Sequence, residues 1–243
     1  MKQACFNILS NEQLTSSVFK MVLEGDTSAI TAPGQFVEIA IEGTYLRRPI
    51  SICDYDATTL TLIYKVVGVG TEIMSRMEPG KKLDLLVGLG NGFDTSKCSS
   101  KALLVGGGVG VPPMFNLARK LLSEGRKVSV ILGFNTVSEA FFVEEFESLG
   151  VDVKLTTVDG SAGIKGFVTD ALYSVDYDYF FACGPIPMLK ALSSAASASG
   201  MVSLEERMGC GFGACMGCTH KMVSGNKRIC KDGPVFEKED VIW

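Results

Sequence analysis

The chain of 243 residues has one histidine, one tryptophan and no long apolar run. Because His220 stands alone, a Rieske-type cluster, which needs two histidines, is excluded. The chain also offers no nucleophile–histidine pair and no recognisable general base for an organic substrate. Its apolar runs, such as Ala102–Val105, are strand-sized and far too short to cross a bilayer. We therefore predict no catalytic side chain and no membrane span.

An excess of basic residues is also missing, since 23 Lys and Arg face 27 Asp and Glu, a net charge of -4. This balance gives no general reason to expect nucleic acid or an anionic membrane as a partner. Residues Met1–Phe6 lack the features of a secretion signal, so we expect a cytoplasmic protein. Disulfides are uncommon there, and clustered cysteines then favour metal or redox chemistry.

The pattern of the chain changes twice along its length. To about Leu86, short β-prone runs separated by turn residues predict a small antiparallel barrel or sandwich, with one helical turn at Thr71–Met77 and Thr71 as its N-cap. From Lys101, alternating strands and helices are typical of a parallel sheet covered by helices. The tail holds four clustered cysteines and little other periodicity. We predict three domains: a β-barrel at residues 1–98, an α/β domain at 99–202 and a small cysteine domain at 203–243.

A glycine motif follows the first strand of the α/β segment, with Gly106, Gly108 and Gly110 in the loop and Pro113 at the start of a helix. Closely spaced glycines let the backbone turn sharply and approach a pyrophosphate at the helix N-terminus. The alternative is a simple strand-to-helix turn. Since strand and helix flank the loop in the right order, we predict that it binds a dinucleotide.

Cys183, Gly184 and Pro185 end another buried strand of this sheet. Ligands bind at the carboxyl ends of such strands, so these residues are candidates to border the reactive ring of the dinucleotide. A small buried cysteine before a turn is an equally good interpretation. Between residues 134 and 138, where a 2′-phosphate would bind, there is no Arg or Lys, which favours NAD over NADP.

Two groups in the β-segment have the chemistry of phosphate donors. Arg47 and Arg48 precede a strand, and arginine grips phosphate oxygens in a bidentate manner. Gly70 and Thr71 open the predicted helix, which offers a further anion site. Each has a surface-charge or capping explanation when taken singly. Together they predict a barrel surface with convergent phosphate donors.

The strongest signal is the cysteine cluster, Cys210, Cys215, Cys218 and Cys230. The spacing C-x4-C-x2-C…C is that of plant-type [2Fe–2S] ligation, and the intervening glycines and alanine let backbone N–H groups approach the sulfurs. Zinc more often takes two C-x2–4-C pairs. We predict a [2Fe–2S] cluster; a four-thiolate zinc site and disulfides remain alternatives.

The order of these motifs resembles that of the ferredoxin–NADP reductase superfamily. The residues concerned are Arg48–Ser51, then Gly-x-Gly-x-Gly-x-x-Pro, then Cys-Gly-Pro. The blocks 204–218 and 228–236 narrow the resemblance to the electron transfer subunits of NAD-dependent (class 1B) dihydroorotate dehydrogenases, over essentially the whole chain. The resemblance implies FAD on the barrel, NAD+ as the acceptor at the parallel sheet and a [2Fe–2S] cluster at the C-terminus.

The resemblance also implies a partner and a role for each site. The partner would be an FMN-containing catalytic subunit that oxidises dihydroorotate, in a heterotetramer of two plus two. Electrons would pass from its FMN through the cluster and FAD to NAD+, in de novo pyrimidine (UMP) biosynthesis. The four clustered cysteines would ligate the cluster. The positions implied for FAD are Arg48, Pro49, Ile50, Ser51, Ile63, Tyr64, Lys65, Gly70 and Thr71.

The inventory of cofactors by itself favours such a relay. Nicotinamide exchanges a hydride, a [2Fe–2S] cluster exchanges single electrons, and a flavin can do both. Two alternatives stay open. One is a small subunit of a ferredoxin-linked NAD(P) oxidoreductase, which would pair with a different flavoprotein. The other is a zinc-stabilised nucleotide-binding regulator without redox activity.

Overall fold

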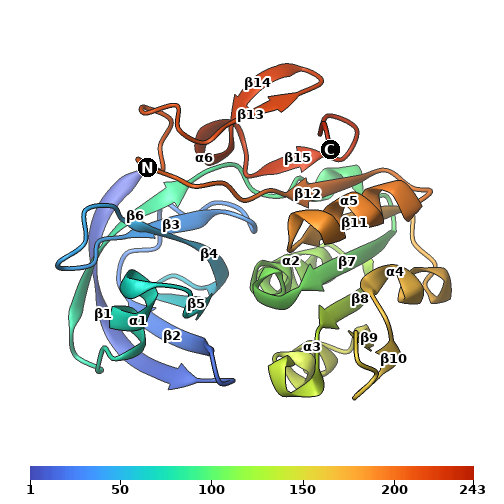
Figure 1. The fold of residues 1–243 in the computed structure, drawn as a ribbon, viewed down its shortest axis with the longest axis horizontal. Coiled ribbons are helices and arrows are strands. Elements are labelled where there is room, and N and C mark those ends of the chain that lie inside the picture. The colour runs from blue at the N-terminus through green and yellow to red at the C-terminus, as the bar shows by residue number, and fades with distance from the viewer. The chain divides into compact units, whose positions relative to one another are not determined.

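The computed structural model describes residues 1–243 and separates them into two units (Figure 1). The first unit consists of residues 1–92, 205–220 and 226–234, and the second of residues 93–204, 221–225 and 235–243. The C-terminal segment therefore contributes to both units, with its four clustered cysteines in the first. No helix combines the length and the apolar character that crossing a membrane requires.

Six antiparallel strands close the first unit into a barrel in the order β1-β2-β5-β4-β3-β6, which confirms the predicted barrel. Inward and outward side chains alternate along them, as in β6, where Leu83, Leu85 and Val87 are buried in the barrel core. The strands are β1 (Lys2–Gln13), β2 (Val18–Glu24), β3 (Phe36–Ile39), β4 (Arg48–Tyr55), β5 (Thr59–Lys65) and β6 (Lys82–Leu89).

The helix after β5, α1 (Val69–Ser75), begins earlier than predicted, and Thr71 is not its N-cap. Gly68 is the N-cap, and Thr71 is the third residue of the helix. Its Oγ1 accepts hydrogen bonds from the backbone N–H groups of Val67 (2.9 Å) and Gly68 (3.2 Å). The N-cap prediction was wrong because a side-chain oxygen at N3 can reach back to the N-cap backbone, as the second half of a capping box does.

The second unit is a seven-stranded sheet in the order β10-β9-β8-β7-β11-β12-β15. All neighbours are parallel except β15, which is antiparallel to β12, so the predicted parallel sheet is confirmed. The strands are β7 (Lys101–Gly107), β8 (Lys127–Phe134), β9 (Asp152–Thr157), β10 (Ile164–Lys165), β11 (Tyr179–Cys183), β12 (Gly200–Ser203) and β15 (Val235–Glu237).

Helices α2 and α3 lie on one side of this sheet, and α4 and α5 on the other (Figure 1). Both faces of the central strands are therefore buried, which is why β7 is apolar and buried from Ala102 to Gly107. The helices are α2 (Pro112–Ser123), α3 (Val143–Ser148), α4 (Val168–Ala171) and α5 (Ile186–Ala195), with short 3-10 turns at Thr95–Lys97, Gly108–Gly110, Val137–Glu139 and Leu172–Ser174.

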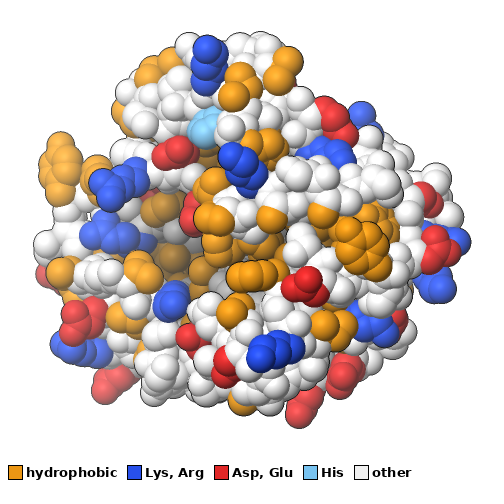
Figure 2. Space-filling view, turned by 45° about the vertical axis from the view of Figure 1, so that its right-hand side comes forward, with side chains coloured by type: hydrophobic (Ala, Val, Ile, Leu, Met, Phe, Trp, Pro, Cys, Tyr) orange, Lys and Arg blue, Asp and Glu red, His pale blue; other side chains and the backbone are white.

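Residues 203–243, which contain the four clustered cysteines and are called the cysteine segment below, add a hairpin and one short helix. β13 (Thr219–Met222) and β14 (Gly225–Arg228) form a two-stranded sheet, and α6 (Ile229–Asp232) follows directly. On the face drawn in Figure 2, basic and acidic side chains are interspersed, as the nearly balanced composition leads one to expect.

Candidate cofactor sites

The residues predicted to bind FAD gather at one end of the barrel. β4 and β5 are antiparallel neighbours, and Ile52 on β4 is the register partner of Leu62 on β5. Arg48–Ser51 precede this pair on β4, and Ile63–Lys65 follow it on β5. Because the two strands are antiparallel neighbours, both segments lie at the same end of the pair.

Arg48 and the start of α1 meet at this end of the barrel. A Cβ added at Gly70 would overlap Nε of Arg48, so glycine at this position leaves the space to the guanidinium. Nη1 of Arg48 donates to the carbonyl oxygens of Leu46 and Arg47. A guanidinium carries five N–H donors. Arg48 therefore keeps donors for an anionic group, and the Arg48–Gly70 contact is a fitting cradle for phosphate oxygens.

Tyr64 contributes to the barrel core through its side chain. It is 2% exposed, its ring stacks on Phe19 with centroids 5.9 Å apart, and its hydroxyl donates to Oδ1 of Asn11 at 2.9 Å. Burial raises the pKa of Tyr64 to about 12. Ile63 is buried as well, whereas Lys65 is exposed. At these positions β5 offers a ligand its backbone and the Lys65 side chain.

The glycine loop and the segment beginning at Cys183 lie side by side at the carboxyl ends of β7 and β11. These strands are parallel neighbours, and Cys183 is the register partner of Gly106. A Cβ added at Gly110 would overlap the carbonyl oxygen of Cys183, and one added at Gly184 would lie 3.2 Å from the backbone nitrogen of Gly107. The structure thus brings the two predicted dinucleotide motifs together, at the edge where open α/β sheets bind ligands.

Helix α2 begins directly after the glycine loop. Gly108–Gly110 form a 3-10 turn, and Pro112 and Pro113 occupy the first positions of α2. A missing N–H costs no hydrogen bond there. The twelve-residue helix directs the positive end of its dipole at the loop, which suits a pyrophosphate.

An acidic residue that the sequence analysis missed follows β8, the strand beside β7. Nδ2 of Asn135 donates to Oε2 of Glu139 at 2.8 Å, which holds this carboxylate near the end of the strand. In dinucleotide-binding sheets, an acidic side chain after the second strand accepts a hydrogen bond from the ribose 2′-hydroxyl and disfavours a 2′-phosphate. Glu139 lies 29 residues beyond Gly110, further along than the roughly 20 residues of that rule, so spacing alone does not identify it.

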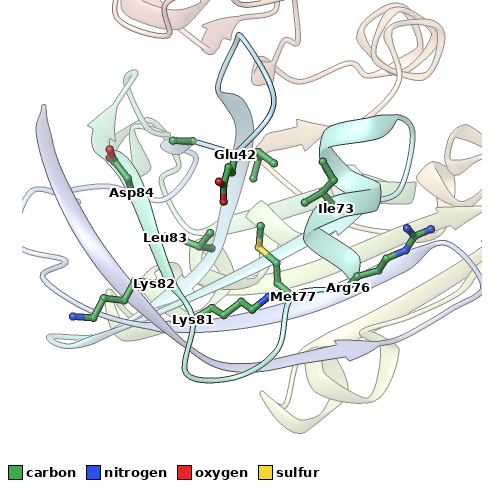
Figure 3. A pocket seen from close by; sticks show the side chains of 10 residues that line it. Glu42, Ile73, Arg76, Met77, Lys81, Lys82, Leu83 and Asp84 are labelled. Carbon is green, nitrogen blue, oxygen red and sulfur yellow. The ribbon is translucent and has the colours of Figure 1, made fainter.

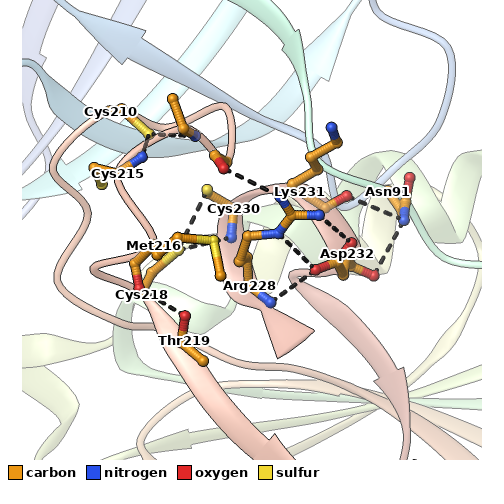
Figure 4. Close-up of polar contacts among 12 residues, drawn as sticks. Asn91, Cys210, Cys215, Met216, Cys218, Thr219, Arg228, Cys230, Lys231 and Asp232 are labelled. Carbon is orange, nitrogen blue, oxygen red and sulfur yellow. Dashed lines mark hydrogen bonds and ion pairs between the residues drawn. The ribbon is translucent and has the colours of Figure 1, made fainter. Parts of the chain in front are cut away.

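The four clustered cysteines lie as two pairs (Figure 4). The sulfurs of Cys218 and Cys230 are 3.3 Å apart. The sulfur of Cys210 interacts with the Cys215 thiol and accepts hydrogen bonds from the backbone N–H groups of Ala214 (3.2 Å) and Cys215 (3.4 Å). None of the eight cysteines forms a disulfide. No group of three or more His, Cys, Asp or Glu side chains converges as a closed metal site, so the arrangement is pairwise.

Backbone N–H groups are directed at the other sulfurs too. The N–H of Gly217 lies 3.4 Å from Sγ of Cys215, and that of Cys230 lies 3.4 Å from Sγ of Cys218. Burial raises the pKa of the Cys210 thiol, but the N–H donors, that of Cys215 foremost, bring it down to about 6. Such donors stabilise a thiolate, which is the form of sulfur that binds metal. The segment therefore fits an iron–sulfur cluster.

Arg228 forms hydrogen bonds with two parts of the cysteine segment (Figure 4). Its Nε and Nη2 donate to the two carboxylate oxygens of Asp232 at 3.0 and 3.2 Å, and its Nη1 donates to the carbonyl oxygen of Gly213 at 3.1 Å. Bidentate pairs of this kind fix the geometry of both partners. Arg228 thereby links the helix that carries Cys230 to the turn after Cys210, a role that spacing alone did not reveal.

A separate cavity of about 610 Å³ opens on the barrel (Figure 3). None of the predicted cofactor residues lines it. Its charged lining residues are of both signs, so the cavity carries no single-sign field that would select an ion. They are Glu42, Arg76, Lys81, Lys82 and Asp84.

Two family models match the chain. The model of the iron–sulfur cluster binding domain of dihydroorotate dehydrogenase B matches residues 205–242. The model of the oxidoreductase NAD-binding domain matches residues 104–194. The two matches fall on the cysteine pairs and on the sheet with the glycine loop.

Several curated proteins are similar to the chain over its full length. The electron transfer subunit of dihydroorotate dehydrogenase B (NAD(+)) from Geobacillus sp. (strain WCH70) is 41% identical over 256 residues, covering 100% of this chain and 99% of that protein. The subunit of the same name from Fusobacterium nucleatum subsp. nucleatum is 41% identical, with 99% of each chain covered.

Solved structures share the fold. An NADH-dependent reduced ferredoxin-NADP oxidoreductase aligns with a TM-score of 0.89 and 30% identity, covering 98% of this chain and 90% of that one. A ferredoxin NADP+ reductase from Neisseria gonorrhoeae aligns with a TM-score of 0.70 over 80% of this chain and 90% of that one. At 16% identity the second likeness concerns the fold alone.

Proposed function

Because the chain belongs to the family of electron transfer subunits of dihydroorotate dehydrogenase B (NAD(+)), we propose that it delivers electrons from a catalytic partner to NAD+. The partner is the FMN-containing, dihydroorotate-oxidising subunit, in a heterotetramer of two plus two in the cytoplasm. The complex serves pyrimidine (UMP) biosynthesis, and this chain carries FAD and a [2Fe–2S] cluster. The pairing of the four cysteines is the observation that carries the proposal, because a two-iron cluster takes two protein ligands at each iron.

The cysteines have distinct places in this proposal. Cys210 and Cys215 would hold one iron, and Cys218 and Cys230 the other, with the backbone N–H donors around them stabilising the thiolates. When bound, the cluster supplies one-electron chemistry, and FAD and NAD+ supply two-electron chemistry. Arg228 holds the two halves of the segment in register for this ligation.

The barrel residues bind FAD in the proposal. Arg48 and Gly70 would hold the pyrophosphate, because the guanidinium keeps free donors and the glycine leaves it room. The backbones of Pro49–Ser51 and Ile63–Lys65 would line the flavin from adjacent strands, with Tyr64 fixing β5 through its bond to Asn11. Thr71 supports the site by closing the first turn of α1.

The sheet binds NAD+ in the proposal. Gly106, Gly108 and Gly110 would let the pyrophosphate approach the start of α2, which Pro113 helps to form. Cys183, Gly184 and Pro185 would border the nicotinamide. Glu139 would accept a hydrogen bond from the adenosine ribose and disfavour NADP.

The direct test of this function uses the chain purified under anaerobic conditions together with its FMN-containing partner. Adding dihydroorotate should reduce NAD+, and the Cys215→Ser variant should keep FAD but lose this turnover. Unimpaired turnover in Cys215→Ser would contradict the assigned route.

One observation favours a second candidate, a small subunit of a ferredoxin-linked NAD(P) oxidoreductase. The NADH-dependent reduced ferredoxin-NADP oxidoreductase aligns over nearly the whole chain. The full-length relatives at 41% identity favour the first candidate. A purified complex that ignores dihydroorotate but reduces NAD(P)+ from reduced ferredoxin would reverse this order.

A further inference from the structure

Glu38 is a buried carboxyl group whose oxygen Oε1 has no hydrogen-bond partner. It lies on β3 and is 1% exposed. Burying a carboxyl group without a partner is costly, so native structures contain few such atoms. None of the cofactor roles assigned above uses this side chain.

The cysteine segment is what covers Glu38. Successive strand residues face opposite sides, and Val37 and Ile39 belong to the barrel core, so Glu38 faces outward. A Cβ added at Gly211 would lie 2.5 Å from both Cγ and Oε1 of Glu38. The turn after Cys210 therefore lies against the carboxyl group and takes its water away.

No cation forms an ion pair with the Glu38 carboxyl. The guanidinium of Arg47 is engaged by the Asp84 carboxylate at 3.1 Å and by the carbonyl oxygens of Glu38 (3.3 Å) and Asp84 (3.0 Å). Burial accordingly dominates and raises the pKa of Glu38 to about 7, with Arg47 opposing the shift and the Cys210 sulfur adding to it.

We propose that Glu38 is a positioning residue for the [2Fe–2S] cluster, supporting the Cys210–Gly213 turn and setting the reduction potential through its carboxyl group. This inference rests on the proposed function, because it needs the cluster that the cysteines bind. One-electron reduction adds one negative charge to the cluster. Above its pKa of about 7, the Glu38 carboxylate in this water-poor site beside the turn after Cys210 disfavours that charge. A neutral amide of the same shape removes the repulsion.

The first test is a potentiometric titration of the holoprotein in buffer about one to two pH units above the pKa of Glu38, followed through the EPR signal of the reduced cluster. We expect Glu38→Gln to favour the reduced cluster about tenfold, which raises the one-electron midpoint potential by about 59 mV. Glu42→Gln is the matched control, because Glu42 is exposed and lies four residues further along the chain. It should leave the midpoint unchanged. A Glu38→Gln midpoint equal to that of the wild type would overturn the proposal.

The second test addresses the turn itself. Gly211→Ala places a methyl group against the Glu38 carboxyl, so we expect lower iron content and an altered EPR line shape. The double variant Glu38→Ala/Gly211→Ala should recover part of the iron, because it removes the clash. Gly43→Ala is the control: its φ of +78° matches the +75° of Gly211, but its Cβ would meet nothing within 4 Å. A double variant no better than Gly211→Ala would contradict the close contact between Glu38 and this turn.

The outcomes separate this inference from the proposed function. A wild-type protein without iron or an EPR signal contradicts the proposed function itself. A wild-type cluster whose midpoint ignores Glu38→Gln contradicts only the role of Glu38. Loss of the cluster from Glu38→Gln with FAD retained supports positioning, since the barrel is then still folded. Loss of both groups overturns the proposal, because Glu38 is then only part of the barrel's folding.

Discussion

Among single residues, Asp178 ties the start of β7 to the turn before β11. Its carboxylate accepts hydrogen bonds from the backbone N–H groups of Ser100 (2.8 Å) and Lys101 (2.9 Å) and from the hydroxyl of Ser99 (2.7 Å). Burial raises the pKa of Asp178, but these hydrogen bonds, that of Lys101 first, outweigh burial and hold it well below its usual range. Asp178 therefore stabilises the fold as an anion.

This depressed pKa gives a prediction about stability. The contribution of Asp178 is fully present above the pKa of about 3.8 in the unfolded chain, and it is lost as the pH falls through the lower folded value. At pH 7 we expect Asp178→Asn to lower the free energy of unfolding by about 1–3 kcal/mol, measured by urea denaturation. The difference from the wild type should stay constant down to about pH 4 and shrink as the pH is lowered further.

Asp176→Asn is the control for this prediction. Asp176 pairs with Lys101, but its side chain is 78% exposed, so the change should stay within about 0.5 kcal/mol. Equal losses in the two variants would show that the hydrogen bonds of Asp178 to Ser99, Ser100 and Lys101 do not account for its effect.

At the scale of elements, the loop between β7 and α2 depends on close backbone approaches. Gly110 lies against the Cys183 carbonyl, so Gly110→Ala has to displace the loop from β11. We predict that NAD+ binding weakens more than tenfold, measured by isothermal titration, while FAD stays bound. Gly125→Ala is the control, because its Cβ would meet nothing within 4 Å although its φ is +77°. Normal NAD+ affinity in Gly110→Ala would contradict the role of this loop.

The contact between β4 and α1 carries the corresponding prediction for FAD. Arg48→Gln removes the guanidinium donors beside Gly70, so we expect the purified variant to lose most of its FAD. Arg76→Gln serves as the control, since Arg76 pairs with Glu72 on the same helix and its side chain is 75% exposed. FAD content, read from the flavin absorbance, should stay normal in Arg76→Gln. Full FAD content in Arg48→Gln would contradict the cradle.

Strands with a clear apolar pattern could be predicted from the sequence, and very short strands could not. The barrel is predicted from strands whose apolar residues alternate, as in β6, and the parallel sheet from strands with a continuous apolar run, as in β7. Both patterns can be read from neighbouring residues in the sequence. β12 and β15 were missed because they are four and three residues long, and β15 lies within the cysteine segment. Short strands are defined by their partners across the sheet, which periodicity does not reveal.

The cofactor-site residues were likewise predictable only where the signal lies in neighbouring residues of the sequence. The cysteines and glycines were predicted because their chemistry and spacing are local to the chain. Glu38 was not, because its burial comes from Gly211, far along the sequence. The position of Tyr64 in a strand suggested a flavin contact, whereas the structure directs its side chain to Asn11. Contacts between distant segments determine the surroundings of Glu38 and Tyr64.

For the molecule as a whole, the C-terminal segment is divided between the two units. Its cysteines belong to the barrel unit, and β15 belongs to the sheet unit. The division into three domains at residues 98 and 202 stays a prediction. Limited proteolysis of the holoprotein should cut near both boundaries if these are independent folding units, and near neither if the segment is integral to its neighbours.

The central claim is that paired cysteines hold a two-iron cluster in a chain that also binds FAD. Iron and acid-labile sulfide analysis of the anaerobically purified protein, together with its absorption spectrum, tests this most directly. We predict about two iron and two sulfide per chain, with flavin bands in the same spectrum. Zinc in place of iron, without flavin bands, would contradict it.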